Sequence, residues 1–87
     1  MSQPLQSLTD CAPGDDRTVA AVAWDALGAG EARRLRELGL DEGVAVALLH
    51  RAPLGGTLAC RIGRMTVAMR RHVAQAIQVA PAILPAE

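Results

Sequence analysis

Between residues 17 and 79 the chain alternates apolar and polar side chains or forms short apolar runs. A two-residue period predicts β-strands, because successive side chains of a strand point to opposite faces of its sheet. The pattern predicts short strands over Arg17–Asp25, Val44–His50, Leu58–Ile62, Met65–Arg70 and Ile77–Val79. The chain is therefore expected to be mainly β.

The alternation also assigns side chains to the two faces of each strand. In the segment from residue 44 to residue 50, one face holds Val44, Val46 and Leu48, and the other holds Ala45, Ala47 and Leu49. In the next two strands we expect these side chains to point inward: Leu58, Cys60, Ile62, Met65, Val67 and Met69. Since the chain has no Phe or Tyr, its core must consist of aliphatic residues, Cys and Met.

One segment has a helical period. Within Glu31–Leu38 the apolar residues Ala32, Leu35 and Leu38 are three apart and share one face. This spacing predicts one amphipathic helix of about two turns, inserted after the first strand. A C-terminal helical turn is expected over Arg71–Ala76, just before the last strand.

Glycines mark the predicted turns, because glycine adopts positive φ at no steric cost. Three are expected to be structural turn residues: Gly39, Gly43 and Gly63. Gly39 lies where a left-handed residue commonly ends a helix. About five short strands can bury a common face only by curling, so we expect a small SH3-like barrel with the one inserted helix.

The two ends of the chain lack this pattern. Residues 1–16 mix Ser, Gln, Pro, Gly and Asp with few apolar positions, and they predict a flexible N-terminal leader. Residues 80–87 contain two prolines and predict a C-terminal tail. Residues 17–79 are expected to form a single barrel domain, which fits a chain of 87 residues.

Composition and charge narrow the classes of function. Trp24 is the single aromatic residue, which argues against a nucleic-acid surface built from stacked aromatics. The net charge is formally zero, but residues 1–42 carry −4 and residues 43–87 carry +4. A small nucleic-acid-binding barrel is an alternative, because five arginines of the second part could follow a phosphate backbone: Arg51, Arg61, Arg64, Arg70 and Arg71. Zero net charge and the lack of aromatics favour the interpretation without a nucleic-acid partner.

The sequence predicts neither an enzyme nor a cofactor or metal site. It has no nucleophile-elbow serine, no Cys-x-x-Cys pair and no lysine for a phosphate-binding loop. Cys60, His50 and His72 would hold a metal ion only if the fold brought them together. The simpler interpretation is that Cys60 fills the core and both histidines lie at the surface.

Cysteine usage and hydropathy favour a cytoplasmic protein. Cys11 lies in the predicted leader and Cys60 in a strand, which favours reduced thiols over a disulfide. The longest uninterrupted apolar runs have six residues, far fewer than the roughly 20 that span a bilayer. The N-terminus also lacks a basic start followed by an apolar stretch, so no signal peptide is predicted.

The loop between the second and third predicted strands offers a partner-binding site. Leu54 lies between a proline and a glycine at the tip, where an apolar side chain has little to bury against. Held there, it would contact a partner; the alternative is that it folds back over an open end of the barrel. The predicted partner-binding residues are Arg51, Pro53, Leu54, Gly55 and Gly56.

An ordered set of short motifs covers nearly the whole patterned region. The motifs are Arg34-Leu35-x-x-Leu38-Gly39-Leu40-x-x-Gly43, Val44-x-Val46, Pro53-Leu54-Gly55-Gly56, Gly63, Val67-Ala68-Met69-Arg70-Arg71 and Ala74-x-x-Ile77-x-Val79. In this set the chain resembles the FeoA family of ferrous-iron uptake proteins. Two positions depart from the family pattern, since Glu42 stands where a proline usually precedes the glycine and Thr57 where a second proline often follows the loop.

The resemblance implies an SH3-like barrel and a small cytosolic accessory protein without catalytic residues. It implies support of Fe(II) import by a FeoB-type membrane GTPase permease, through contact with the cytosolic GTPase part and with the membrane only through that partner. Similar domains form the C-terminal module of metal-dependent repressors, so a metal-sensing module is a further alternative, although no helix-turn-helix is predicted here. Pairing of edge strands would also allow a homo-oligomer.

Overall fold

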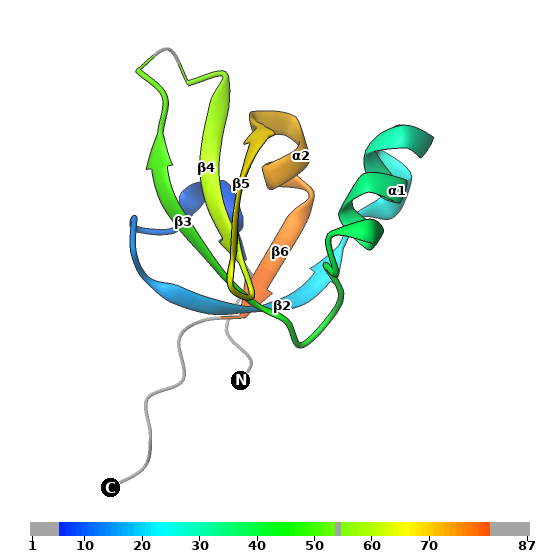
Figure 1. The fold of residues 1–87 in the computed structure, drawn as a ribbon, viewed down its shortest axis with the longest axis horizontal. Helices are drawn as coiled ribbons and strands as arrows, with labels where there is room; N and C mark the ends of the chain where they lie inside the picture. The colour runs from blue at the N-terminus through cyan, green and yellow to red at the C-terminus, as the bar shows by residue number, and fades with distance from the viewer. Residues whose placement is uncertain (1–5, 54, 81–87) are drawn as a thin grey trace, which may run out of the picture.

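The computed structural model describes residues 6–53 and 55–80. These residues form one antiparallel sheet of six strands: β1 (Gln6–Ser7), β2 (Asp16–Val22), β3 (Ala45–Arg51), β4 (Thr57–Ile62), β5 (Met65–Arg70) and β6 (Ile77–Ala80). The strands are hydrogen-bonded in the order β1-β6-β2-β3-β4-β5. As Figure 1 shows, the sheet curls into a small barrel, with the short helix α2 (Arg71–Gln75) at one end and the helix α1 (Ala29–Glu37) beside it. The mainly β prediction is confirmed.

β2 allows the sheet to curl, because it belongs to both sides of the barrel. Its residues Asp16–Thr18 pair with β3, whereas Thr18–Val22 pair with β6. A register shift between Val19 and Ala21 interrupts the second of these ladders, and a similar shift interrupts the β3–β4 ladder. Such irregularities bend a strand and increase its twist. The sheet can therefore bury one concave face.

The interior of the barrel is aliphatic, as predicted. The largest fully buried side chains are Leu8, Leu40, Leu48, Leu58, Ile77, Val46, Val79, Cys11 and Cys60. The inward positions predicted in β4 are confirmed, since its three apolar side chains at 58, 60 and 62 are all buried. Because these residues come from positions 8 to 79 of the chain, segments far apart in the sequence share one core.

The predicted flexible leader is wrong for Gln6–Cys11. This segment forms β1, which pairs with β6, and the 3₁₀ turn η1 (Leu8–Asp10), and Leu8 is fully buried. A short stretch with one leucine and one cysteine gives no periodic signal, yet both side chains fill the end of the barrel. The barrel accordingly has six strands rather than about five.

Two further predictions about strands need correction. The first strand ends at Val22, and Trp24–Ala26 forms a 3₁₀ turn (η2) instead of continuing it. Met65, predicted to point inward, is 45% exposed, since it lies at the β4–β5 hairpin, where the sheet no longer covers it.

The predicted amphipathic helix exists, but it begins two residues earlier, at Ala29. Its start is stabilised by the Gly28 N–H, which donates to Oε1 of Glu31 at 3.1 Å. At its end the Gly39 N–H donates to the Arg36 carbonyl and the Leu40 N–H to the Leu35 carbonyl. These two bonds define a Schellman motif, which requires a left-handed residue at Gly39. Its φ of +90° meets that requirement.

Candidate partner-binding site

Of the predicted partner-binding residues, Arg51 ends β3, and Pro53, Gly55 and Gly56 lie in the loop that joins β3 to β4 at one end of the barrel (Figure 1). The loop is closed by two backbone hydrogen bonds of 2.9 Å, from the Ala52 N–H to the Thr57 carbonyl and from the Gly55 N–H to the Ala52 carbonyl. Pro53 and Gly56 are exposed. Leu54, on which the sequence-based prediction centred, lies outside the described residues. The loop is therefore positioned by rigid strands and accessible to a partner.

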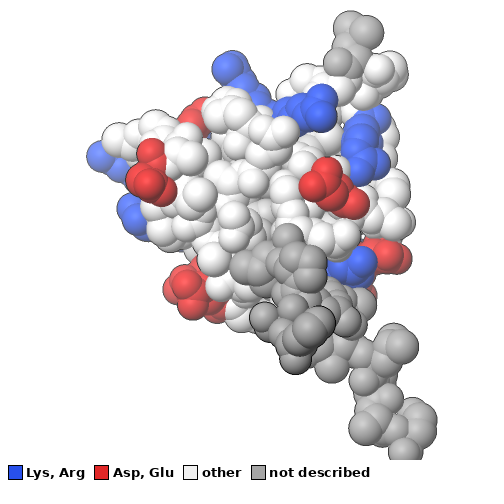
Figure 2. All heavy atoms as spheres, turned by 180° about the vertical axis from the view of Figure 1, so that it is seen from behind, with Lys and Arg blue, Asp and Glu red and all other residues white. Residues whose placement is uncertain are grey.

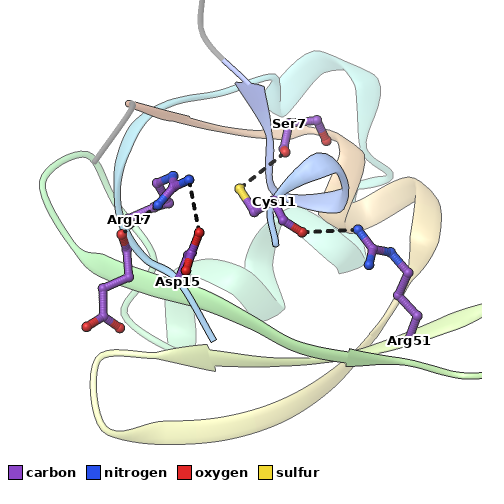
Figure 3. Close-up of polar contacts among 6 residues, drawn as sticks. Ser7, Cys11, Asp15, Arg17 and Arg51 are labelled. Carbon is purple, nitrogen blue, oxygen red and sulfur yellow. Dashed lines mark hydrogen bonds and ion pairs between the residues drawn. The ribbon is translucent and has the colours of Figure 1, made fainter. Parts of the chain in front are cut away.

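Arg51 has a structural role that the sequence did not predict. Its Nη2 donates to the backbone carbonyl of Thr9. It also donates to the backbone carbonyl of Cys11 at 3.1 Å, the bond drawn in Figure 3. The Cys11 thiol in turn donates to the Ser7 carbonyl at 3.7 Å. Because a guanidinium presents several donors in a fixed plane, one side chain can satisfy two carbonyls of a turn. Arg51 thus ties the N-terminal segment to the base of the predicted site.

Glycine conformation shapes both this loop and the other turns. Gly55 has a φ of +77°, and a Cβ added there would lie 3.7 Å from Nη1 of Arg71. The three predicted turn glycines also have positive φ: Gly39, Gly43 and Gly63. Gly55 therefore contributes to the loop through its left-handed backbone conformation. Arg71, the first residue of α2, lies close to this loop.

Charged side chains are interspersed rather than gathered by sign. Figure 2 shows acidic and basic residues alternating around one face of the molecule, with uncharged surface between them. Arg61 forms an ion pair with Asp16, and Arg17 pairs with Asp15 at 3.5 Å. The opposite net charges of the two parts of the sequence are thus partly mixed in space, because β2 lies against β3 and close to β4.

The predicted alternative metal ligands have different environments. Cys60 is fully buried, and burial raises the pKa of its thiol to about 11. His50 and His72 are exposed, and Nε2 of His72 lies 2.6 Å from Oε2 of Glu31. Over residues 6–53 and 55–80, no group of three His, Cys, Asp or Glu side chains could hold a metal ion.

A groove that the sequence did not predict separates α1 from β5. It has a volume of about 230 Å³, and its floor is apolar: Leu35, Leu38, Val67, Met69 and Val73. Arg34 and Arg70 stand at its rim. The spacing of residues 31, 34, 35 and 38 along one helical face was visible in the sequence. The sequence could not show that this helical face leaves a groove beside β5 instead of packing fully against that strand.

Glu31 links the two helices at one end of this groove. The pKa of its carboxyl is held below the usual range, first by the hydrogen bond from the Gly28 N–H and then by the one to His72. The second of these partners belongs to α2, so one carboxylate both caps α1 and contacts the neighbouring helix.

The helices among the described residues are too short and too polar for any of them to cross a lipid bilayer.

Comparison with known proteins finds a matching domain family and similar solved structures. Residues 6–81 match the FeoA domain, whereas a comparison with curated proteins returned no match. The solution structure of the FeoA protein from Chlorobium tepidum is 33% identical with a TM-score of 0.75, over 86% of this chain and 69% of that chain. FeoA from Stenotrophomonas maltophilia, determined in complex with zinc, is 30% identical with a TM-score of 0.68, over 88% of this chain and 89% of that chain.

The likeness extends to part of a larger protein. A manganese-dependent transcriptional repressor is 28% identical with a TM-score of 0.79, over 94% of this chain but only 44% of the repressor. The Stenotrophomonas protein is described as a prokaryotic SH3-domain protein, and the predicted SH3-like barrel is confirmed by this match. The FeoA domain is a non-enzymatic accessory domain. With a match that covers residues 6–81, the chain belongs to the FeoA domain family.

Proposed function

We propose that this protein is a cytoplasmic accessory factor of ferrous iron uptake, which binds the cytosolic GTPase part of a FeoB-type permease and modulates transport. The observation that carries the proposal is the match of residues 6–81 to the FeoA domain. It is supported by the 30% identity to the Stenotrophomonas protein, which is described as a candidate ferrous iron transport activating factor.

The loop between β3 and β4 is the proposed contact with the permease. Two backbone hydrogen bonds close the base of the loop, which reduces the conformational entropy that these residues lose when a partner binds. Its exposed residues stand clear of the barrel core. The proposed contact residues are Arg51, Pro53, Leu54, Gly55 and Gly56, with the Arg51 guanidinium acting by holding the base of the loop in place.

An uptake assay tests the proposed function as a whole. A strain that lacks this gene should accumulate less Fe(II) under anaerobic conditions, and the gene supplied in trans should restore accumulation. Unimpaired accumulation in the deletion strain would contradict the proposal.

A binding assay tests the proposed surface. Leu54→Asp should weaken capture of the permease's purified GTPase domain, with and without GTP, because it places a carboxylate where an apolar contact is proposed. Met65→Asp is the matched control, since it makes the same kind of change at an exposed apolar residue on the β4–β5 hairpin. Equal binding by both variants, with unchanged melting curves, would remove the loop from the interface.

A further inference from the structure

β5 is an edge strand with unused hydrogen-bonding groups. Among the strands that the structure describes, its only neighbour is β4. Ile62 lies opposite Met65 next to the two-residue turn, so the odd-numbered residues of β5 exchange hydrogen bonds with β4. The N–H and C=O groups of Thr66 and Ala68 therefore point to the outer edge.

The groove beside α1 runs along this edge. Its volume of about 230 Å³ is smaller than the roughly 300–1,000 Å³ of a site for a drug-sized molecule. A space of this size suits one or two apolar side chains, and Val67 and Leu38 in its floor are only half buried. The edge thus offers backbone hydrogen bonds next to an apolar recess.

The rim of the groove is positively charged. Arg34 and Arg70 are exposed, and neither forms an ion pair with a residue in the described ranges. Glu31 is the one carboxylate among the residues that line the groove, and its oxygens face the Gly28 N–H and His72. Its negative charge offsets one of the two arginines, so the lining residues retain a net positive charge, which complements a carboxylate.

We propose that the β5 edge and the adjoining groove bind an extended segment of a partner protein that combines apolar and acidic residues. The segment adds a strand to β5, places an apolar side chain in the groove and sets a carboxylate against Arg34 and Arg70. In such complexes main-chain bonds supply affinity and the side-chain pockets supply specificity. The proposal goes beyond the proposed function, because it assigns a second surface away from the β3–β4 loop.

Charge favours a partner segment over a second copy of this chain. β5 has the sequence Met-Thr-Val-Ala-Met-Arg, with no acidic residue, and Arg64 precedes it. Antiparallel pairing of two β5 strands would bring arginines of both copies toward one another without a carboxylate between them. Like charges across paired strands are destabilising.

A selection experiment tests the proposal on the full chain. A phage-displayed library of random peptides is selected on the folded protein, and the enriched peptides are expected to alternate apolar residues with others and to carry Asp or Glu. An ¹⁵N-labelled sample titrated with the best peptide should show shifts confined to β5 and the facing side of α1. Failure to enrich peptides, or enrichment of basic ones, would overturn the proposal.

Two matched pairs of variants locate the binding. Ala68→Pro removes an edge N–H but no ladder bond, so it should weaken peptide binding about tenfold or more, whereas Ala68→Val should bind like the wild type. Arg34→Glu should weaken binding, whereas Arg33→Glu, an exposed neighbour outside the groove, should not. Because Arg34 is exposed, the second pair decides the question even where Ala68→Pro does not fold.

The remaining outcomes separate this proposal from the proposed function. Peptide binding that survives both Ala68→Pro and Arg34→Glu would overturn strand addition at β5. Concentration-dependent shifts in β5 without peptide would also overturn it, since a second copy would then occupy the edge. None of these results bears on capture of the permease domain by the β3–β4 loop, which is measured separately with Leu54→Asp.

Discussion

The strands of the barrel and the helix α1 both bury aliphatic side chains, but they are attached to the molecule in different ways. β3 and β4 are each hydrogen-bonded to a strand on both sides, and β3 joins the β3–β4 hairpin to β2, which lies much earlier in the chain. α1 is a helix and not part of the sheet, and Figure 1 shows it beside the barrel. It is attached through Ala32 and Leu35, which are buried, and through the contact of Glu31 with His72.

The barrel is therefore expected to be the more stable region of the molecule, and α1 the more adaptable one. A barrel strand cannot separate from the sheet without breaking its backbone hydrogen bonds and exposing core side chains to water. The strands are therefore expected to unfold as one unit. A helix attached by one stripe of side chains can move or fray at a smaller free-energy cost. The groove lies on the boundary between the two regions, which suits a site where a ligand is to be inserted.

The largest effect is expected in the barrel. Leu48→Ala, at a fully buried position of β3, should lower the free energy of unfolding by about 3 kcal/mol, because the cavity lies in a core that cannot collapse around it. Urea denaturation measures the loss. Leu49→Ala, at the half-buried next residue, is the control and should cost clearly less; equal losses would contradict the unequal burial of the two faces.

A smaller effect is expected when the same change is made in α1. Leu35→Ala should cost about 2 kcal/mol, at the low end for a buried leucine, because the site borders an existing groove. Hydrogen exchange should become faster in α1 while the strands remain protected. If β3 and β4 lost protection to the same degree, the helix and the barrel would form a single cooperative unit.

Next in size is the loss of the turn that joins α1 to the barrel. Gly39→Val should destabilise the protein by about 1–2 kcal/mol, since a β-branched residue is strained at a φ of +90°. Gly30→Ala is the control: no atom lies within 4 Å of the added Cβ, and alanine favours the helix. A neutral Gly39→Val in thermal melts would contradict the left-handed helix end.

The smallest effect concerns the capping carboxylate and depends on pH. Because the pKa of Glu31 is lower in the folded chain, its contribution to stability is present above the unfolded pKa and is lost as the pH falls through the folded one. Glu31→Gln should therefore lower the melting temperature slightly at pH 7, and this difference should shrink as acid protonates the carboxyl. A difference that persists in acid would assign the effect to packing instead of charge.

Local features of this fold were predictable from sequence because their signals are local. The alternation in Met65–Arg70 placed β5 with its observed bounds, and the spacing of Ala32 and Leu35 identified α1. The candidate loop was predictable for the same reason, since proline and glycine between two apolar strands mark a turn. The ordered motifs also resembled those of the FeoA family, and the match over residues 6–81 confirms that family.

Which distant segments meet depends on the fold of the whole chain and has no local signal. Nothing in the residues around Leu8 predicts that it fills the barrel, because its burial depends on β6 and α2, about 70 residues later. The same holds for Arg51, whose hydrogen-bond acceptors belong to the N-terminal turn, and for the groove between α1 and β5. Periodicity records which side of its own element a residue occupies, whereas burial and pairing are set by what the rest of the chain places against that side.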